Sequence, residues 1–215
     1  MKHQSIKILF GVLLTILSFG FTSGQVKTTD PIKALAEKVN PSNGILIEFT
    51  LNYPDQKPIS GCTLLAQGEK FHLTTMPLTA WYNGELLWVM QSGTNEVNLT
   101  SPSESELEEL ALLISLNRML KQHFTTSVQQ LSNNMFRFVA TPRVGYEGMI
   151  TSLSIDTDSS YSPTIVRFKE KGDRKQDKET VIEIKKITKP YETKGKNFEF
   201  DKKNFPRGIE VIDLR

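Results

Sequence analysis

The sequence is poor in the residue that cross-links exported proteins. It contains one cysteine, Cys62, in 215 residues. A single cysteine excludes an internal disulfide, whereas animal secreted proteins of this size usually carry several. If the chain is exported, the lack of disulfides favours a bacterial envelope.

Residue patterns for catalysis and metal binding are also missing. His72 and His123 lie about fifty residues apart, and neither has a second histidine, a cysteine or a carboxylate at metal-ligand spacing. The sequence has no Gly-x-Ser-x-Gly motif, phosphate-binding loop or dinucleotide fingerprint. We interpret Cys62 as a buried structural thiol, and the acidic run 104–109 as a helix start rather than a paired-carboxylate site. We expect a protein that is not an enzyme and needs no metal or cofactor.

A surplus of one charge sign is absent as well. The formal net charge is +2, and the first 24 residues contain Lys2 and Lys7 but no acidic residue. Without them the formal net charge is zero. A nucleic-acid-binding protein would show a basic surplus on one face. We therefore expect no nucleic-acid partner.

The N-terminus has the pattern of a secretion signal. Lys2 and Lys7 accompany an apolar run from Ile8 to Phe21, and Thr22-Ser23-Gly24 supplies the small residues that signal peptidase requires. The run is shorter than the roughly 20 residues that span a bilayer as a helix. We expect residues 1–24 to be a signal peptide cleaved near Gly24, and residues 25–215 to form one monomeric domain in the periplasm.

Hydrophobic periodicity divides this domain into strands and helices. Asp30 and Pro31 are typical of a helix start, and the segment 31–39 has one apolar stripe. Residues 44–100 alternate apolar and polar side chains between turns, and Asn83-Gly84 strongly favours a hairpin. This region is expected to form an antiparallel meander of about six strands.

A helical insertion follows the meander. Ser103 and Glu106 match a capping box, and the segment 104–116 is apolar on most of its circumference, so it has two faces to bury. Residues 118–130 are expected to form a second, broken helix. Four more strands are expected at 136–140, 152–156, 166–168 and 182–184. The charged segment 170–180 is expected to be the tip of the hairpin between the last two.

About ten strands with a helical insertion predict a mainly β protein with helices (α+β), a strongly curved antiparallel sheet wrapped over the helices. Its large apolar side chains allow two interpretations: an ordinary core, or the lining of a cavity between sheet and helix. In the second interpretation, segment 104–116 is a lid that uses Leu107, Leu110, Leu113 and Ile114. The lining would then be Ile47, Phe49, Phe71, Leu73, Trp81, Trp88, Met90, Phe136 and Phe138.

Two stretches resemble a known family. The run from Trp81 to Met90, followed by Asn95-Glu96-Val97, resembles the central hairpin of the periplasmic outer-membrane lipoprotein carriers, the LolA family. The C-terminal Phe198-x-Phe200 and the pattern Pro206-x-Gly208-Ile209-x-Val211-Ile212 are similar to that family's closing element. The chain departs from the family after Gly61, where members place an Arg-Pro pair whose arginine helps to hold the lid closed; here Cys62-Thr63 follow.

The resemblance implies a half-open β-barrel covered by a helical lid. Its cavity would shelter the acyl chains of a lipoprotein, taken from an inner-membrane release complex and given to an outer-membrane acceptor. No nucleotide or metal would be required of the carrier. The alternative is a periplasmic scaffold or sensor of the same fold that binds a free lipid or a protein.

Overall fold

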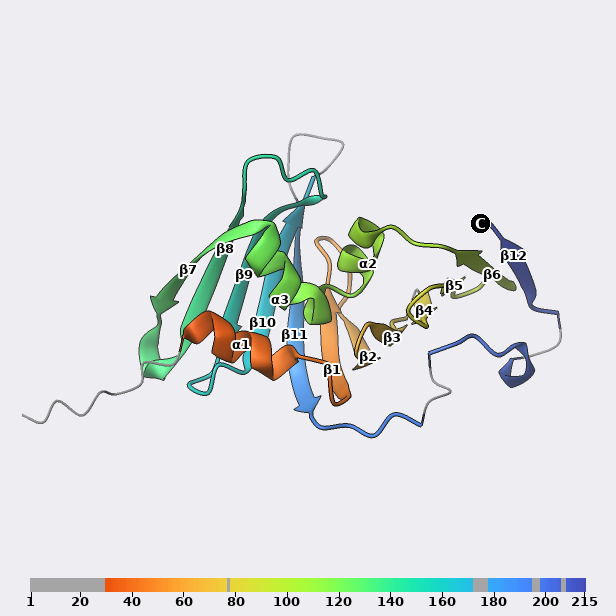
Figure 1. Ribbon diagram of the computed structural model, residues 1–215, viewed down its shortest axis with the longest axis horizontal. Helices are drawn as coiled ribbons and strands as arrows, with labels where there is room; N and C mark the ends of the chain where they lie inside the picture. Colours follow the sequence, from red (N-terminus) through yellow and green to blue (C-terminus); the bar gives the residue numbers. More distant parts are fainter. Residues whose placement is uncertain (1–29, 77, 172–177, 195–197, 206–207) are drawn as a thin grey trace, which may run out of the picture.

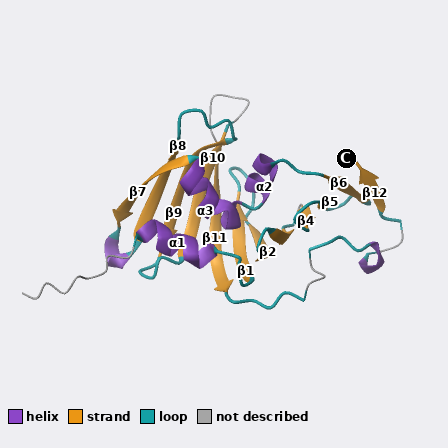
Figure 2. Cartoon of the chain, viewed as in Figure 1, coloured by secondary structure: helices purple, strands orange, loops and turns teal. Residues whose placement is uncertain are grey.

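The computed structural model describes residues 30–76, 78–171, 178–194, 198–205 and 208–215. The expected signal peptide and its cleavage site lie outside these residues. The described chain forms one sheet of twelve strands with three α-helices against one of its faces (Figure 1). Strands make up most of the regular structure (Figure 2).

The elements follow the chain as one helix, a first series of strands, two helices and a second series of strands. Short 3₁₀ turns lie at Ser132–Asn134 and Lys202–Asn204. In chain order the other elements are α1 (Pro31–Val39), β1 (Ile45–Asn52), β2 (Ile59–Gln67), β3 (Lys70–Thr74), β4 (Leu78–Tyr82), β5 (Leu87–Gln91), β6 (Glu96–Thr100), α2 (Glu104–Leu110), α3 (Leu112–Gln122), β7 (Phe124–Gln130), β8 (Phe136–Pro142), β9 (Ile150–Thr157), β10 (Pro163–Glu170), β11 (Lys178–Thr188) and β12 (Glu210–Asp213).

The strand order in the sheet is β12-β6-β5-β4-β3-β2-β1-β11-β10-β9-β8-β7. Two meanders, β1–β6 and β7–β11, join where β1 pairs with β11. All pairs are antiparallel except β12 with β6, which run parallel. One large, curved and unclosed antiparallel sheet with a few helices confirms the expected fold class.

The sequence missed the two edge strands. Residues 118–130 were expected to be a broken helix, but α3 ends at Gln122 and β7 begins at Phe124. Thr125, Thr126 and Val128 are β-branched and favour a strand. With β12 at the other edge, the sheet has twelve strands where ten were expected. Edge strands are hydrogen-bonded on one side only, and β7 is largely exposed, so it lacks the apolar alternation that reveals inner strands.

The lid segment is two helices rather than one. The predicted capping box is present: the Glu106 amide donates to the Ser103 hydroxyl oxygen at 3.3 Å, and the Ser103 amide donates to the Glu106 carboxylate at 2.7 Å. Ala111, with φ −119° and ψ 39°, leaves the helical conformation and separates α2 from α3. The break lets α2 and α3 point in different directions over the sheet (Figure 1).

Helices α1 and α3 lie over the strands of the second meander (Figure 1). Asp30 caps α1 by accepting a hydrogen bond from the Ile32 amide at 3.0 Å. Fully buried side chains in this layer include Leu35, Val39, Leu116, Met119, Phe124, Phe138 and Ile155.

The convex face of β2–β6 is covered by the C-terminal part of the chain, which runs from β11 around to the β6 edge (Figure 1). Trp81 meets Phe200 and Phe205 edge-on, with ring centroids 5.5 and 5.7 Å apart. The Asn83 side-chain amide donates to the Glu199 carboxylate at 3.1 Å. This segment therefore gives the thin sheet a second apolar layer.

The C-terminal segment begins at a close approach of two backbones. The Tyr191 amide donates to the Gly44 carbonyl at 3.0 Å. Gly44 has φ +73°, and a Cβ at this position would overlap the Tyr191 carbonyl oxygen. Only glycine meets both conditions without strain. The turn before β1 therefore anchors the segment that crosses the convex face.

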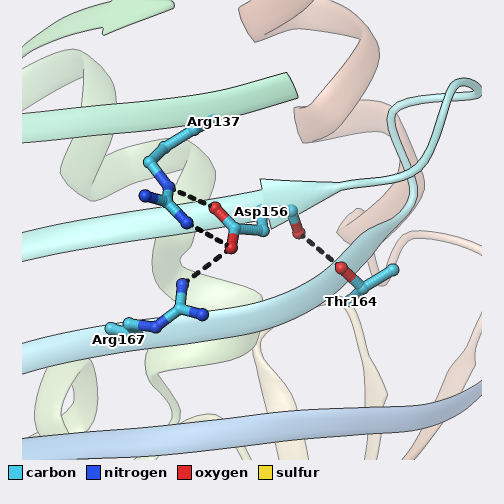
Figure 3. Close-up of polar contacts among 4 residues, drawn as sticks. All are labelled: Arg137, Asp156, Thr164 and Arg167. Carbon is cyan, nitrogen blue, oxygen red and sulfur yellow. Dashed lines mark hydrogen bonds and ion pairs between the residues drawn. The ribbon is translucent and has the colours of Figure 1, made fainter. Parts of the chain in front are cut away.

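A charged cluster on the convex face ties β8, β9 and β10 together. Asp156 accepts hydrogen bonds from Arg137 at 2.6 and 2.8 Å and from Arg167 at 2.8 Å (Figure 3). The Thr164 hydroxyl donates to the Asp156 carbonyl at 3.1 Å. The hydrogen bonds from Arg137 are the main cause of a lowered pKa for Asp156, against an opposing effect of burial. Charge-assisted, bidentate pairs of this kind fix strand register.

Candidate ligand-binding cavity

A partly open cavity of about 510 Å³ lies between the concave face of the sheet and the point where α2 meets α3. It has the volume of a typical small-molecule site. Strands form its floor and the helix junction forms its roof. The apolar residues that line it are Phe49, Leu51, Leu64, Leu73, Leu78, Val89, Phe168 and Ile182 from the strands, and Leu110, Leu112 and Leu113 from the helices.

The polar lining residues gather at one end of the cavity because of strand direction. β1, β3, β5 and β10 all run the same way, since one antiparallel strand separates each from the next. Tyr53, Thr75, Gln91 and Glu170 lie at or just beyond the ends of these strands, and the β5–β6 turn follows. The cavity is therefore apolar under the helices and polar at this end. We call it the polar end; its residues are Tyr53, Thr75, Gln91, Thr94, Glu96 and Glu170.

Helix α2 has a hollow on each side. Leu110 lines the main cavity, whereas Leu107 lines a second pocket of about 220 Å³ together with Phe71, Tyr82 and Ile114. A helix packed against two hollows has lost part of the dispersion contact that fixes a core helix.

Ion pairs brace α2 against α3. Arg118 of α3 lies 3.0 Å from the Glu104 carboxylate and 3.2 Å from that of Glu108, and the His123 ring lies 3.5 Å from Glu108. Glu108 is only 5% exposed, although neither its Oε1 nor the Arg118 Nε has a well-oriented hydrogen bond. The pairing is therefore electrostatic more than directional. The ion pairs of Arg118 connect two helices, whereas the arginine of the Arg-Pro pair that this chain lacks would lie on a strand.

Four of the residues expected at the site line the main cavity: Phe49, Leu73, Leu110 and Leu113. Phe71, Leu107 and Ile114 line the second pocket. Ile47 and Phe138 are fully buried in the core of the same face. Phe136 stacks on Tyr161 at 4.7 Å between ring centroids. Lipid contact by any of these residues stays a prediction.

Three expected residues lie on the other face of the sheet. Trp81 and Trp88 pair across β4 and β5, and Met90 shares their side of β5. Trp81 stacks on His72, with ring centroids 5.2 Å apart, and contacts the C-terminal aromatic rings. These side chains therefore belong to the convex layer and are not part of the cavity lining.

Sequence reasoning missed the smaller residues that line the cavity. Leu78 and Val89 lie on the face of β4 and β5 opposite to that of the expected Trp81, Trp88 and Met90. The register of the Asn83-Gly84 hairpin could have identified Val89. It pairs Trp81 with Trp88, so that Val89 must lie on the opposite face of the sheet. The tryptophans were expected in the lining because their side chains are large. The alternation within single strands does not reveal that the C-terminal segment packs against Trp81 on the other face.

The described residues offer little for catalysis or for metal binding. Cys62 is buried, and this burial raises the pKa of its thiol. Burial also lowers the pKa of His72, which stacks on Trp81 away from the cavity. Within the described ranges, no group of three His, Cys, Asp or Glu side chains is placed to hold a metal ion. The helices among these residues are too short or too polar to cross a bilayer.

Two solved structures resemble this one. An uncharacterized conserved protein from Thermus thermophilus matches with a TM-score of 0.50 and 8% identity, over 87% of this chain and 99% of that chain. A LolA superfamily protein from Nitrosomonas europaea matches with a TM-score of 0.41 and 9% identity, over 79% of this chain and 97% of that chain. At such identity, the first likeness concerns the fold alone.

Comparison with curated proteins found no match. The sequence profile of the family described as outer membrane lipoprotein carrier protein LolA matches residues 22–172. The matched range holds α1, both lid helices and the strands β1–β10, and so all the cavity-lining residues except Ile182. The resemblance noted in the sequence is confirmed, and the chain belongs to the family of the outer membrane lipoprotein carrier protein LolA.

Proposed function

We propose that the protein is a periplasmic carrier that shelters the acyl part of lipoproteins in its main cavity and delivers them from the inner to the outer membrane. The observation that carries this proposal is the apolar, partly open cavity of about 510 Å³ under the α2–α3 junction. Membership of a carrier family supports it. Its partners would be an acylated cargo, a release complex at the inner membrane and an acceptor at the outer membrane.

The energetics of an acyl chain fit a cavity of this kind. Each methylene group taken out of water is worth about 0.8 kcal/mol, so a sixteen-carbon chain needs on the order of 12 kcal/mol of shelter. A carrier that supplied all of it could not release the chain at its destination. The open cavity covers the chain in part, and a cargo bound this way stays exchangeable.

Helix α2 is suited to be the part that moves. It has hollows on both sides, so it can shift without breaking a close-packed layer. The ion pairs of Arg118 with Glu104 and Glu108 limit how far it shifts in the empty protein. A lid of this type needs two arrangements of similar free energy, one empty and one loaded.

The proposal is tested by placing a charge in the cavity roof. Leu110 is half-buried and lines the cavity, whereas Leu86 is half-buried and lies at the β4–β5 turn outside it. We expect Leu110→Arg to abolish co-purification of acylated peptides from bacterial envelopes, because a buried, unpaired guanidinium opposes an apolar ligand. Leu86→Arg is the matched control and should retain its cargo. Circular dichroism shows that both variants are folded.

Mass spectrometry of the gently purified protein identifies the cargo. Acylated peptides that are found with the wild type and with Leu86→Arg, but not with Leu110→Arg, support the carrier function. Free phospholipid or a stoichiometric protein partner in their place would favour the alternative, a periplasmic scaffold or sensor of the same fold. Acylated peptides retained equally by both variants would contradict the assignment of the cavity.

A further inference from the structure

The cavity has charges of one sign at its polar end. Glu96 and Glu170 are the charged residues among those that line it. No lysine, arginine or histidine of the described chain belongs to the lining. A cavity with this lining is therefore apolar at the helices and negative where the head of an amphiphilic ligand would lie.

A third acidic residue reinforces the negative charge. β12 pairs with β6 in parallel, and this register places Glu210 beside Glu96. Like charges opposite one another on neighbouring strands are destabilising. Within the described ranges, neither glutamate has an ion-pair partner. The C-terminal strand thus adds to the negative charge at this corner of the sheet.

Glu170 acts on the opposite side of the polar end. Burial is the main cause of the raised pKa of the Tyr53 phenol, and the negative charge of Glu170 is the next. Tyr53 and Glu170 both line the cavity at the ends of parallel-running strands. The field of Glu170 therefore reaches into the cavity. Gln91 and Thr94 add neutral hydrogen-bonding groups at the polar end.

We propose that the cavity takes one acyl chain with its tail towards the helices, and that Glu96 and Glu170 select an acylated peptide with positive charge beside its acylated residue. The inference rests on the proposed function and specifies its cargo. The cavity volume suits a single small-molecule-sized ligand. The acidic residues attract a cationic peptide and repel the phosphate of an anionic phospholipid. Anionic lipids of the membrane are thereby disfavoured against the cargo.

The test compares two probes that differ only in the charge of the head. These are N-palmitoylated Gly-Gly-Lys-Lys and Gly-Gly-Glu-Glu with the same fluorophore, titrated into the full mature chain at about 10 mM ionic strength, where charges act over roughly 30 Å. We expect the lysine probe to bind about five- to tenfold more tightly. Lysophosphatidylglycerol, an anionic single-chain lipid, should compete poorly with it.

Two double variants assign the preference to the cavity. The double variant Glu96→Gln, Glu170→Gln should bind the lysine probe less tightly and the glutamate probe more tightly, so that the preference falls below about twofold. Both probes should still bind, because the acyl chain is unchanged. Glu37→Gln with Glu85→Gln changes the net charge equally, and both of these residues are exposed and outside the cavity. This control should keep the full preference.

The outcomes separate this inference from the proposed function. Tight binding of both probes with equal affinity, or a preference that survives in the cavity variant, overturns the charge selection and leaves the carrier intact. A preference for the glutamate probe or for lysophosphatidylglycerol overturns it as well. Failure of the cavity to bind either probe removes the acyl site, and the proposed function falls with it.

Discussion

The two halves of the concave face are built from similar strands but are covered differently. Beneath α1 and α3, the strands β7–β9 are packed, and Phe138 and Leu116 are fully buried (Figure 1). Over β1–β6 and the adjoining parts of β10 and β11, the junction of α2 and α3 leaves a cavity of about 510 Å³. We call these the closed half and the open half. The same face of one sheet is thus a packed core in one place and the floor of a cavity in another.

The difference follows from how much sheet a helix can cover. Strands lie about 4.8 Å apart, and a helix with its side chains is about 10 Å wide, so one helix covers about two strands. The nine-residue α1 and most of the eleven-residue α3 lie over the closed half, whereas the seven-residue α2 and the first residues of α3 form the roof of the open half. An incomplete cover over a wide sheet produces a cavity without any special lining residue.

The largest expected effect compares two truncations on the concave face. Phe138→Ala in the closed half should lower the free energy of unfolding by about 3–5 kcal/mol, because it creates a cavity in a packed layer. Val89→Ala in the open half should lower it by about 1 kcal/mol or less, because Val89 is half-buried beside a cavity that already exists. Urea denaturation measures both. Equal losses would mean that the open half is packed as tightly as the closed half.

An intermediate effect is expected from the charged cluster on the convex side of the closed half. Asp156→Asn should lower the free energy of unfolding by about 2 kcal/mol at neutral pH, because Arg137 and Arg167 lose their shared carboxylate (Figure 3). Acyl-probe binding in the open half should not change. If binding falls with stability, the two halves are coupled and the comparison fails.

The same cluster has a defined pH dependence. Its hydrogen bonds lower the pKa of Asp156 in the folded state. The stabilisation is therefore complete above the ordinary aspartate pKa of about 3.9 and is lost as the pH falls through the lower, folded value. The difference in stability between wild type and Asp156→Asn should shrink below about pH 4. A difference that stays constant to lower pH would contradict the role of the carboxylate.

The smallest expected effect concerns the lid of the open half. Arg118→Leu leaves the buried Glu108 carboxylate with only His123 nearby. We expect about 1 kcal/mol of local destabilisation, seen as roughly fivefold faster amide hydrogen exchange in α2. Exchange in β8 and β9 should be unchanged, and Arg118→Lys should restore part of the protection. Faster exchange throughout the closed half would show that the ion pairs serve the whole fold.

The sequence was sufficient for most inner elements. The helix at 31–39 and the Ser103–Glu106 capping box were predicted from their residues and are present. The Asn83-Gly84 hairpin is present as well. Such features depend on neighbours in the chain, so local chemistry determines them. The edge strands β7 and β12 were not predicted. Strand β12 forms only by pairing with the distant β6, and β7 is mostly exposed to solvent.

The sequence by itself determined the alternation of each strand, the helix caps, the turns and the family resemblance. Only the tertiary structure decided which face of each strand looks inward, because a period of two is the same for both faces. That choice moved Trp81 and Trp88 to the convex layer under the C-terminal segment, and placed Val89 and Leu78 in the cavity. The cavity itself arises from distant elements, since it is the part of the curved sheet that three short helices do not fill.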